Sequence, residues 1–337
     1  MKKNDYFSLK FENDKVVFID QTLLPLTEKY IETDEYERIA EAIERLEIRG
    51  APLIGIAAAY ALSLSLKNVS ANHSEIFYAA YQRLYLTRPT AVNLFYALEE
   101  IKKVFDEETS YDDVYPILVS RAKELHQKDI EYCKWIGMNG LKIFKKKSNI
   151  ITHCNTGKFA TGGDGTAFNV IKTGFENGLV SIVYADETRP LLQGLRLTSF
   201  ELDKNNIPFK LLSDSSSGAL MQKGEVDFAI VGADRIALNG DTANKIGTYN
   251  LAVLCNFHNI PFYVAAPSTT IDKKILSGAD IKIEFRNKEE LLTLNQNDIA
   301  STSYDVFSPA FDVTPSHLIN GIITEDAVYN FPYNFLQ

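Results

Sequence analysis

The chain has 337 residues, of which 45% are hydrophobic and 23% charged, and its formal net charge at pH 7 is -9. This balance is typical of a globular protein with room for two domains, and an acidic chain is a poor candidate for binding nucleic acid. The most apolar run, residues 53–66, is too short to span a bilayer, and the amino-terminal residues do not resemble a signal peptide. Three cysteines without a CxxC pair indicate neither a zinc nor a disulfide framework, so we expect a cytoplasmic protein with no membrane partner.

The first part of the chain is predicted to combine a small β element with helices. Its firmest strand covers residues 16–19. Apolar residues at helical spacing predict the helices 34–48, 53–66, 74–86, 91–105 and 114–144, the last of them in two pieces divided at Gly137 or Gly140. An acidic, polar link at residues 106–113 indicates a boundary, so we predict a small, mainly helical domain over residues 1–115.

The pattern changes after residue 148, where apolar runs begin to alternate with helical stretches. The runs are 150–151, 181–185, 209–212, 226–231, 262–266 and 281–285. The helical stretches are 166–176, 193–203, 217–222, 248–257 and 271–276. Such alternation predicts an α/β fold, with a parallel sheet covered by helices on both faces, in a second domain over residues 116–337.

Polar clusters follow four of the predicted strands, at residues 153–157, 186–190, 213–218 and 232–235. Because the carboxyl ends of parallel strands meet at one edge of a sheet, four clusters in succession favour a ligand site there. No GxGxxG sequence follows a predicted strand and no GxxxxGK[ST] sequence occurs, so neither a dinucleotide fingerprint nor a P-loop is indicated.

The stretch 226–253 is the most informative of these regions. A buried strand is followed by Asp234, by the polar residues Asn244 and Lys245, and by Gly247 directly before a predicted helix. A lysine and a glycine before the amino end of a helix suit an anion, because the backbone N–H groups and the helix dipole both point toward it. The stretch therefore predicts a phosphate seat, and an ordinary polar surface loop is the alternative.

Individual residues support more than one interpretation. Cys154 is a candidate nucleophile or acid–base thiol, and a small buried hydrophobe is the alternative. Asp234 could be a general acid if an apolar pocket keeps it protonated, and otherwise a loop carboxylate or a partner for its neighbour Arg235. His153 precedes Cys154, and adjacent strand residues face opposite ways, so a packing or capping role is predicted for it. Arg49, in a turn between helices, could bind phosphate or cap a helix end.

Seven runs of the sequence, in family order over about residues 18–325, resemble the methylthioribose-1-phosphate isomerase family. They are IRGAPLIGIAAAYAL, RPTAVNLFYAL, THCNTG, ETRPLLQGLRLT, VGADRIALNGDTANKIGTYNLAV, PFYVAAP and PAFDVTPSHLINGIITE. The wider group includes regulatory subunits of translation initiation factor 2B and ribose-1,5-bisphosphate isomerases. The resemblance implies conversion of 5-methylthioribose 1-phosphate to 5-methylthioribulose 1-phosphate without metal or other cofactor. It also implies a small mixed amino-terminal domain, a Rossmann-like catalytic domain and a homodimer.

The resemblance also implies which residues form the site. THCN places the catalytic cysteine at Cys154, and GADRI places the catalytic aspartate at Asp234. The implied substrate contacts are Arg49, Gly50, Ala51, Arg88, Gln193, Asn244 and Lys245.

Departures from the usual family text flank these positions and leave the 5-substituent of the substrate open. They are Thr156, the stretch 159–168 and Ser308. A 5-deoxy or a 5-phosphate sugar is the alternative substrate, and Lys158 is the residue that keeps a 5-phosphate under consideration. A regulatory protein that binds a sugar phosphate or nucleotide without turnover is the second class, and such a protein has no need of the Cys154 and Asp234 pair.

Overall fold

The computed structural model describes residues 6–88, 92–108, 113–294 and 297–335, and the chain forms two compact units. The first unit comprises Met1–Lys134 and Thr156–Gly165, and the second comprises Trp135–Asn155 and Thr166–Gln337. The predicted boundary between residues 115 and 116 lies in the first turn of helix α5 (Val114–Gly140), whereas the units divide after Lys134, within the same helix. An uninterrupted helical pattern carries no local signal of this division.

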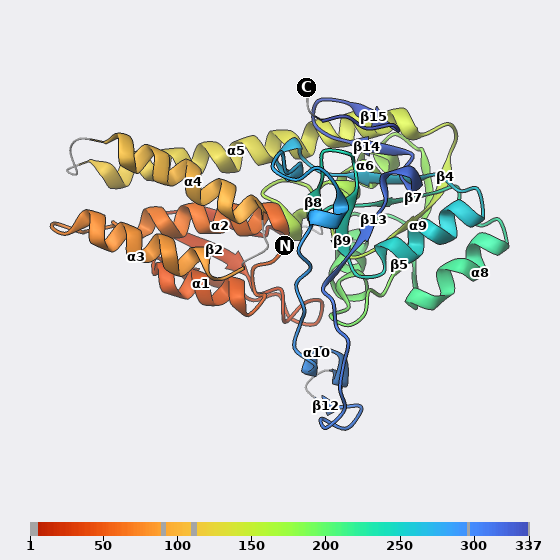
Figure 1. The fold of residues 1–337 in the computed structure, drawn as a ribbon, viewed down its shortest axis with the longest axis horizontal. Coiled ribbons are helices and arrows are strands. Elements are labelled where there is room, and N and C mark those ends of the chain that lie inside the picture. Colours follow the sequence, from red (N-terminus) through yellow and green to blue (C-terminus); the bar gives the residue numbers. More distant parts are fainter. Residues whose placement is uncertain (1–5, 89–91, 109–112, 295–296, 336–337) are drawn as a thin grey trace. The chain divides into compact units, whose positions relative to one another are not determined.

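The first unit contains a three-stranded antiparallel sheet and the helices predicted from the sequence (Figure 1). The strands are β1 (Leu9–Glu12), β2 (Lys15–Ile19) and β3 (Tyr30–Thr33). The helices are α1 (Tyr36–Glu44), α2 (Ala51–Leu64), α3 (His73–Tyr85), α4 (Val92–Glu107) and the first part of α5. Helix α5 ends at Gly140, one of the two predicted breaks, and a 3-10 turn follows it. Parts of the predicted helix 91–105 and of the acidic link fall outside the described residues.

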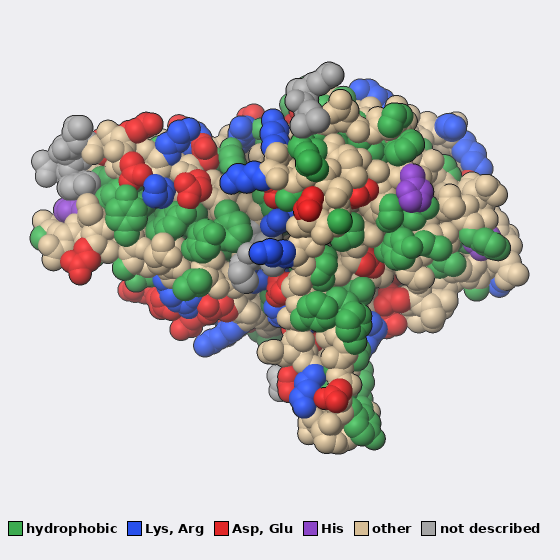
Figure 2. All heavy atoms as spheres, in the orientation of Figure 1, with side chains coloured by type: hydrophobic (Ala, Val, Ile, Leu, Met, Phe, Trp, Pro, Cys, Tyr) green, Lys and Arg blue, Asp and Glu red, His purple; other side chains and the backbone are tan. Residues whose placement is uncertain are grey.

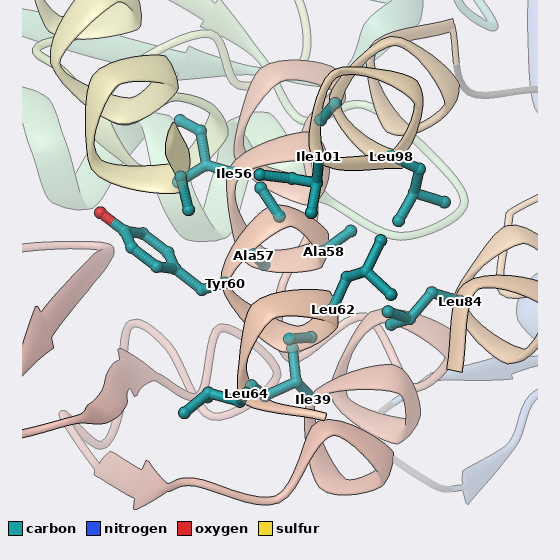
Figure 3. Packing of buried hydrophobic residues seen from close by; sticks show 14 of the residues in the cluster. Ile39, Ile56, Ala57, Ala58, Tyr60, Leu62, Leu64, Leu84, Leu98 and Ile101 are labelled. Carbon is teal, nitrogen blue, oxygen red and sulfur yellow. The ribbon is translucent and has the colours of Figure 1, made fainter. Parts of the chain in front are cut away.

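Helix α2 forms the centre of this unit because it is apolar on every side. All of its residues except Pro52 are buried, as expected for a helix without a polar face. Figure 3 shows Ile56 and Leu62 of α2 among side chains from the surrounding helices, including Leu84 of α3 and Leu98 of α4. The amino end of α2 is thereby held in place, and the predicted substrate residues at positions 49–51 lie there.

The second unit is built on a seven-stranded sheet with the order β15-β14-β10-β7-β4-β5-β6. The strands are β4 (Ser148–Thr152), β5 (Val180–Asp186), β6 (Phe209–Leu212), β7 (Phe228–Val231), β10 (Phe262–Ala265), β14 (Gly321–Ile323) and β15 (Val328–Asn330). All neighbouring pairs are parallel except β14 with β15. The predicted α/β class with a parallel sheet is confirmed.

Helices cover both faces of this sheet. The adjacent residues Ile150 and Ile151 of β4 belong to different buried clusters, because successive strand residues point to opposite faces. The Ile150 cluster includes side chains of α6 (Ala167–Glu176) and α7 (Ser199–Lys204). The Ile151 cluster includes side chains of α8 (Ser217–Gln222) and α9 (Thr248–Phe257). Apolar runs buried on both faces are what the sequence pattern predicted.

Two predicted elements are wrong. Residues 271–276 form bends and turns instead of a helix, and residues 281–285 contribute only an isolated bridge from Phe285 to Pro309. Both are short apolar runs, for which local pattern does not distinguish helix, strand and packed loop.

Two smaller sheets complete the second unit. One has the order β13-β9-β8, with β8 at Arg235–Ile236, β9 at Thr242–Lys245 and β13 at Phe311–Thr314. The other is the pair β11 (Thr293–Leu294) and β12 (Asn297–Asp298), which lies with α10 (Glu289–Leu292) on an arm that projects from this unit in Figure 1. Hydrophobic side chains show on the arm in Figure 2, and Phe307 is 80% exposed. Among the described residues, no helix combines the length and apolarity that a membrane crossing requires.

Candidate active site

The two predicted catalytic residues follow neighbouring strands of the large sheet. Strands β4 and β7 are parallel and pair directly, and Cys154 follows β4 as Asp234 follows β7. The chain runs from β4 through β5 to β6 on one side, then returns to place β7, β10 and β14 on the other. The strand order therefore reverses between β4 and β7, and ligands of open α/β sheets bind at the carboxyl ends of the strands flanking such a switch point.

Cys154 has a left-handed backbone with a φ of 64°, and two threonine hydroxyl groups hold it. Its amide donates to Thr188 Oγ1 at 2.8 Å, and its carbonyl accepts from Thr198 Oγ1 at 2.6 Å. A non-glycine residue in this region costs about 1–3 kcal/mol and persists only where its surroundings fix it. The side chain is 9% exposed. The strand end thus turns sharply at the residue predicted to carry the chemistry.

The loop after β5 supplies this support. Thr188 also has a φ of 64°, and its amide donates to Asp214 Oδ1 at 2.8 Å. The next amide, that of Arg189, donates to Asp214 Oδ2 at 2.8 Å. One carboxylate therefore binds two successive N–H groups and holds the Thr188 hydroxyl toward Cys154. Thr188 lies within the ETRP run, but no local signal in that run indicates this role.

Gln193 begins an unusual helical turn at the same edge. Residues Gly194–Thr198 form a π-helix, a feature that occurs frequently at functional sites. A Cβ on Gly194 would lie 1.7 Å from the carbonyl oxygen of Asp186, so only glycine permits this close approach. Gln193 is 6% exposed, and its Oε1 has no hydrogen-bond partner within the part of the chain that the structure describes. A buried acceptor in this state is available to a ligand hydroxyl group.

Asn155, next to Cys154, is fixed by a buried carboxylate. Its Nδ2 donates to Glu201 Oε1 at 2.9 Å, and Glu201 has no exposed surface. This contact ties the β4 turn to α7.

The Asp234 segment forms a small antiparallel ladder. The amide of Asp234 donates to the carbonyl of Ala243 at 2.9 Å, which places Asp234 beside the start of β9. Asp234 is half-buried. Its neighbour Arg235 makes an ion pair with Asp272, with Nη1 and Oδ2 3.3 Å apart. The segment predicted as a polar loop is therefore part of a three-stranded sheet.

The predicted substrate residues of this segment lie on β9. Asn244 is 4% exposed, and its Nδ2 donates to Thr248 Oγ1 at 2.9 Å. Lys245 Nζ lies 5.1 Å from the centre of the Phe311 ring. These contacts orient both side chains from the strand into the first turn of α9 and onto β13.

The predicted phosphate seat at the amino end of α9 needs correction. The amide of Gly247 donates to Asp312 Oδ2 at 2.7 Å, and the amide of Tyr249 donates to Asp312 Oδ1 at 3.0 Å. These two N–H groups are therefore occupied by a carboxylate of the chain itself and are not open to a phosphate. The helix begins at Thr248 as predicted. The pattern correctly indicated an anionic group at this helix end, but that group is the side chain of Asp312 and not a phosphate of the ligand.

The remaining predicted substrate residues belong to the first unit. Arg49 and Gly50 precede α2, and Ala51 is its first residue. Gly50 has a φ of 91°, and a Cβ there would lie 2.4 Å from the Cα of Ala160. A glycine is therefore required where this turn meets the segment Thr156–Gly165 of the same unit. Arg49 and Arg88 are half-buried, and the residues after Arg88 in its motif, 89–91, lie outside the described residues.

Lys158 has a structural environment. Its Nζ lies 3.1 Å from Asp164 Oδ1 and 5.1 Å from the centre of the Tyr6 ring, all within the first unit. The positive charge that kept a 5-phosphate under consideration is thus offset by a neighbouring carboxylate.

His153 makes contacts that the sequence pattern did not predict. Its side chain is 1% exposed, with Nδ1 3.1 Å from Asp186 Oδ2 and Nε2 2.9 Å from the carbonyl oxygen of Ile246. His153, Asp186 and Asp214 together offer atoms within 4.8 Å of one another, a donor set that could approach a cation. The carboxylates, however, already accept hydrogen bonds from Ser217 and from the Thr188 and Arg189 amides, so we assign the cluster a structural role.

Comparison with known proteins relates the chain to one enzyme group. The profile of the Initiation factor 2 subunit family matches residues 47–330. The methylthioribose-1-phosphate isomerase of Caldicellulosiruptor saccharolyticus is 48% identical over 328 residues, which cover 96% of each chain. The enzyme of the same name from Geotalea uraniireducens is 47% identical over 332 residues, covering 97% of this chain and 96% of the relative.

Solved structures give the same result for the fold. The 5-methylthioribose 1-phosphate isomerase of Pyrococcus horikoshii OT3 has a TM-score of 0.91 and 41% identity, and the match covers 98% of this chain and 95% of that one. The translation initiation factor eIF-2B subunit delta of A. fulgidus has a TM-score of 0.85 and 38% identity, with 98% and 97% covered. Both likenesses extend over almost the whole chain.

Proposed function

Because the chain belongs to the Initiation factor 2 subunit family and, within it, to the methylthioribose-1-phosphate isomerases, we propose that it converts 5-methylthioribose 1-phosphate to 5-methylthioribulose 1-phosphate in methionine salvage. The protein is an aldose–ketose isomerase. The observation that carries the residue assignment is the strained backbone of Cys154, held by Thr188 and Thr198 beside the β7 end that leads to Asp234. Strain of this kind clusters at active sites.

Asp234 is our candidate for the acid that opens the sugar ring. Carbon 1 of the substrate carries a phosphate ester, so the ring cannot open to a free aldehyde as an ordinary sugar does. A proton from the Asp234 carboxyl group to the ring oxygen allows the bond between that oxygen and carbon 1 to break. Its position at the carboxyl end of β7, next to β4, supports this assignment.

Hydrogen then moves from carbon 2 to carbon 1, by one of two routes. In the proton route, Cys154 takes the proton from carbon 2, an enol forms between carbons 1 and 2, and carbon 1 is then protonated as the carbon 2 carbonyl forms. In the hydride route, hydrogen passes with its electron pair from carbon 2 to the cationic carbon 1, and the carbon 2 hydroxyl loses its proton. Cys154 then acts by position and polarity. Full incorporation of label from deuterated solvent at carbon 1 would contradict the hydride route.

The remaining residues are assigned to binding. Arg49, Arg88 and Lys245 are assigned to binding and neutralising the phosphate group, a role suited to charged donors. Gln193 and Asn244 bind the sugar hydroxyl groups, and the buried Oε1 of Gln193 supports this assignment. Gly50 and Ala51 contribute backbone at the start of α2. The reaction as written uses no metal or redox cofactor.

The test is turnover of three matched sugar 1-phosphates that carry 5-methylthio, 5-deoxy or 5-phosphate groups. We expect a clear preference for the methylthio substrate and loss of turnover in Asp234→Asn and Cys154→Ala. A preference for another substituent would keep the reaction and change the pathway. Turnover of none of the three by the native protein would contradict the proposal and favour a regulatory sugar-phosphate or nucleotide binder.

We also propose a homodimer in the cytoplasm, with no nucleic-acid or membrane partner. The three cysteines, Cys133, Cys154 and Cys255, are buried thiols, which suits a reducing compartment. Exposed aromatic side chains on the arm, such as Phe285 and Phe307, support association with a second copy. Sedimentation of the purified protein would test the dimer directly, and a monomer at micromolar concentration would contradict it.

A further inference from the structure

Both ring nitrogens of His153 face hydrogen-bond acceptors. Nδ1 faces a carboxylate oxygen of Asp186 at 3.1 Å, and Nε2 faces the carbonyl oxygen of Ile246 at 2.9 Å. A neutral imidazole carries one N–H group, so one of these contacts would set a nitrogen lone pair against an oxygen lone pair. Only the imidazolium, with two N–H groups, can donate to both.

Burial raises the pKa of Asp186, the partner of this ring, and its contacts with His153 and Ser217 oppose that shift. Asp186 is 2% exposed, its Oδ2 lies 3.1 Å from Nδ1 of His153, and its Oδ1 accepts from Ser217 Oγ at 2.6 Å. With Asp186 ionised, both of its oxygens act as acceptors, one toward His153 and one toward Ser217. A buried cation and a buried anion in direct contact compensate each other, whereas either alone would be costly.

The other charged groups around His153 favour the same state. Asp214 Oδ1 lies 4.0 Å from Nδ1, and Asp312, on β13, also attracts the ring. Burial lowers the pKa of His153, but the hydrogen bond and charge of Asp186 and the charge of Asp214 outweigh it, so the net pKa is raised. The Cys255 thiol also lies near the pair; burial raises its pKa, and the charge of Asp186 adds to that shift.

The same ring joins two parts of the site. His153 follows β4 directly before Cys154, and its bond to Ile246 fixes the backbone just after Asn244 and Lys245. A Cβ on Gly247 would lie 2.8 Å from Cε1 of the ring, so the glycine allows the imidazole to lie against this segment.

We propose that His153 is a positioning residue, held as an imidazolium by Asp186, that fixes the Asn244–Lys245 segment against the strand-end turn of Cys154. This inference rests on the proposed function only where it predicts a change in the KM for the sugar phosphate. The protonation state and the packing it maintains are properties of the protein without substrate.

Nuclear magnetic resonance on ligand-free protein with ¹⁵N-labelled histidine tests the protonation state. At about pH 8, where an ordinary histidine is neutral, we expect two ring N–H protons on His153, assigned by their loss in His153→Gln. A single ring proton at that pH would overturn the proposal. This measurement needs no substrate, so it succeeds or fails independently of the isomerase assignment.

The kinetic test uses Asp186→Asn, which removes the counter-charge and lowers the pKa of His153. As pH rises from about 6 to about 9 the ring then loses its proton, and we expect the KM for the sugar phosphate to rise about tenfold while the native KM stays flat. His258→Gln, at the carboxyl end of α9, is the matched control and should behave as the native enzyme. An Asp186→Asn KM that follows the native pH profile would contradict a positioning role. If Asp186→Asn does not fold, His153→Gln should show a raised KM that does not change between about pH 6 and about pH 9, and a native KM in that variant would count against the proposal.

Discussion

Cys154 and Thr188 share one unusual backbone conformation, each with a φ of 64°, and the Cys154 amide donates to the Thr188 hydroxyl at 2.8 Å. The same hydroxyl donates to the carbonyl of Asp186 at 3.1 Å. Two strained residues at the ends of neighbouring strands therefore stabilise each other, and the hydroxyl group between them acts as both donor and acceptor. The Thr188 hydroxyl group thus helps to hold the Cys154 turn.

Replacing Thr188 by valine tests this relationship. The change keeps the shape of the side chain but leaves the buried Cys154 amide without its acceptor, which costs about 1–3 kcal/mol of the free energy of unfolding. Displacement of the Cys154 turn should lower kcat about 100-fold. Thr188→Ser, which keeps the hydroxyl, is the control for both urea unfolding and turnover. Equal activity in the valine and serine variants would show that the hydroxyl does not hold the site.

Gln193 allows stability and binding to be separated. Its Oε1 is buried without a hydrogen-bond partner among the residues described here, so Gln193→Met removes an unsatisfied polar group at nearly constant volume. We expect the ligand-free protein to gain about 1 kcal/mol of unfolding free energy and the KM for the sugar phosphate to rise. Calorimetry and steady-state kinetics measure the two effects. A variant that is both less stable and unchanged in KM would contradict a substrate contact.

The large sheet could be predicted because its strands are apolar on both faces and are separated by turns and helical stretches. Their carboxyl ends then indicated where Cys154 and Asp234 would lie, without any knowledge of side-chain contacts. Strand β9 was not predicted, because its longer pairing, with β13, depends on residues distant in sequence. The two compact units divide inside the continuous helix α5, where the sequence carries no local signal of a boundary.

The support of the site had no local signal either. Asp312 binds the amides of Gly247 and Tyr249 across more than sixty positions of chain, by a contact that only the folded sheet creates. The left-handed backbone of Cys154 is similarly imposed by Thr188 and Thr198. Residue type and strand position thus predicted the candidate reacting groups, whereas tertiary hydrogen bonds determine how they are held.

Asp312 should make stability depend on pH in a definite direction. Burial raises the pKa of this carboxyl group, although its bonds from the Tyr249 and Gly247 amides oppose the shift. A raised folded-state pKa means that stability is lost as pH rises from the unfolded pKa, about 3.9, through the folded one. Asp312→Asn removes that dependence, but its amide group offers one acceptor oxygen where the carboxyl group of Asp312 offers two.

We therefore expect Asp312→Asn to be less stable than the native protein by about 1–2 kcal/mol at about pH 4. The difference should narrow as pH rises toward about 7, because only the native protein carries the cost of ionising the buried group. Urea unfolding at a series of pH values measures it. A difference that widens with pH would mean that the charged form of Asp312 is favoured in the folded state.

The cysteines should differ in reactivity toward alkylating reagents. Burial raises the pKa of Cys255 to about 12, and it also raises the pKa of Cys133, whereas Cys154 lies at a strand-end turn and keeps 9% of its surface exposed. Because the thiolate is the reacting form, a thiol with a pKa of about 12 is ionised to only about one part in ten thousand at about pH 8. We expect iodoacetamide to label Cys154 at least about tenfold faster than Cys255 in the folded protein, with peptide mass spectrometry as the readout.

Labelling in urea provides the control, since the labelling rates of the three cysteines should then converge. Equal labelling rates at Cys154 and Cys255 in the folded protein would contradict this prediction. They would mean that burial under α9 does not protect Cys255 from the reagent.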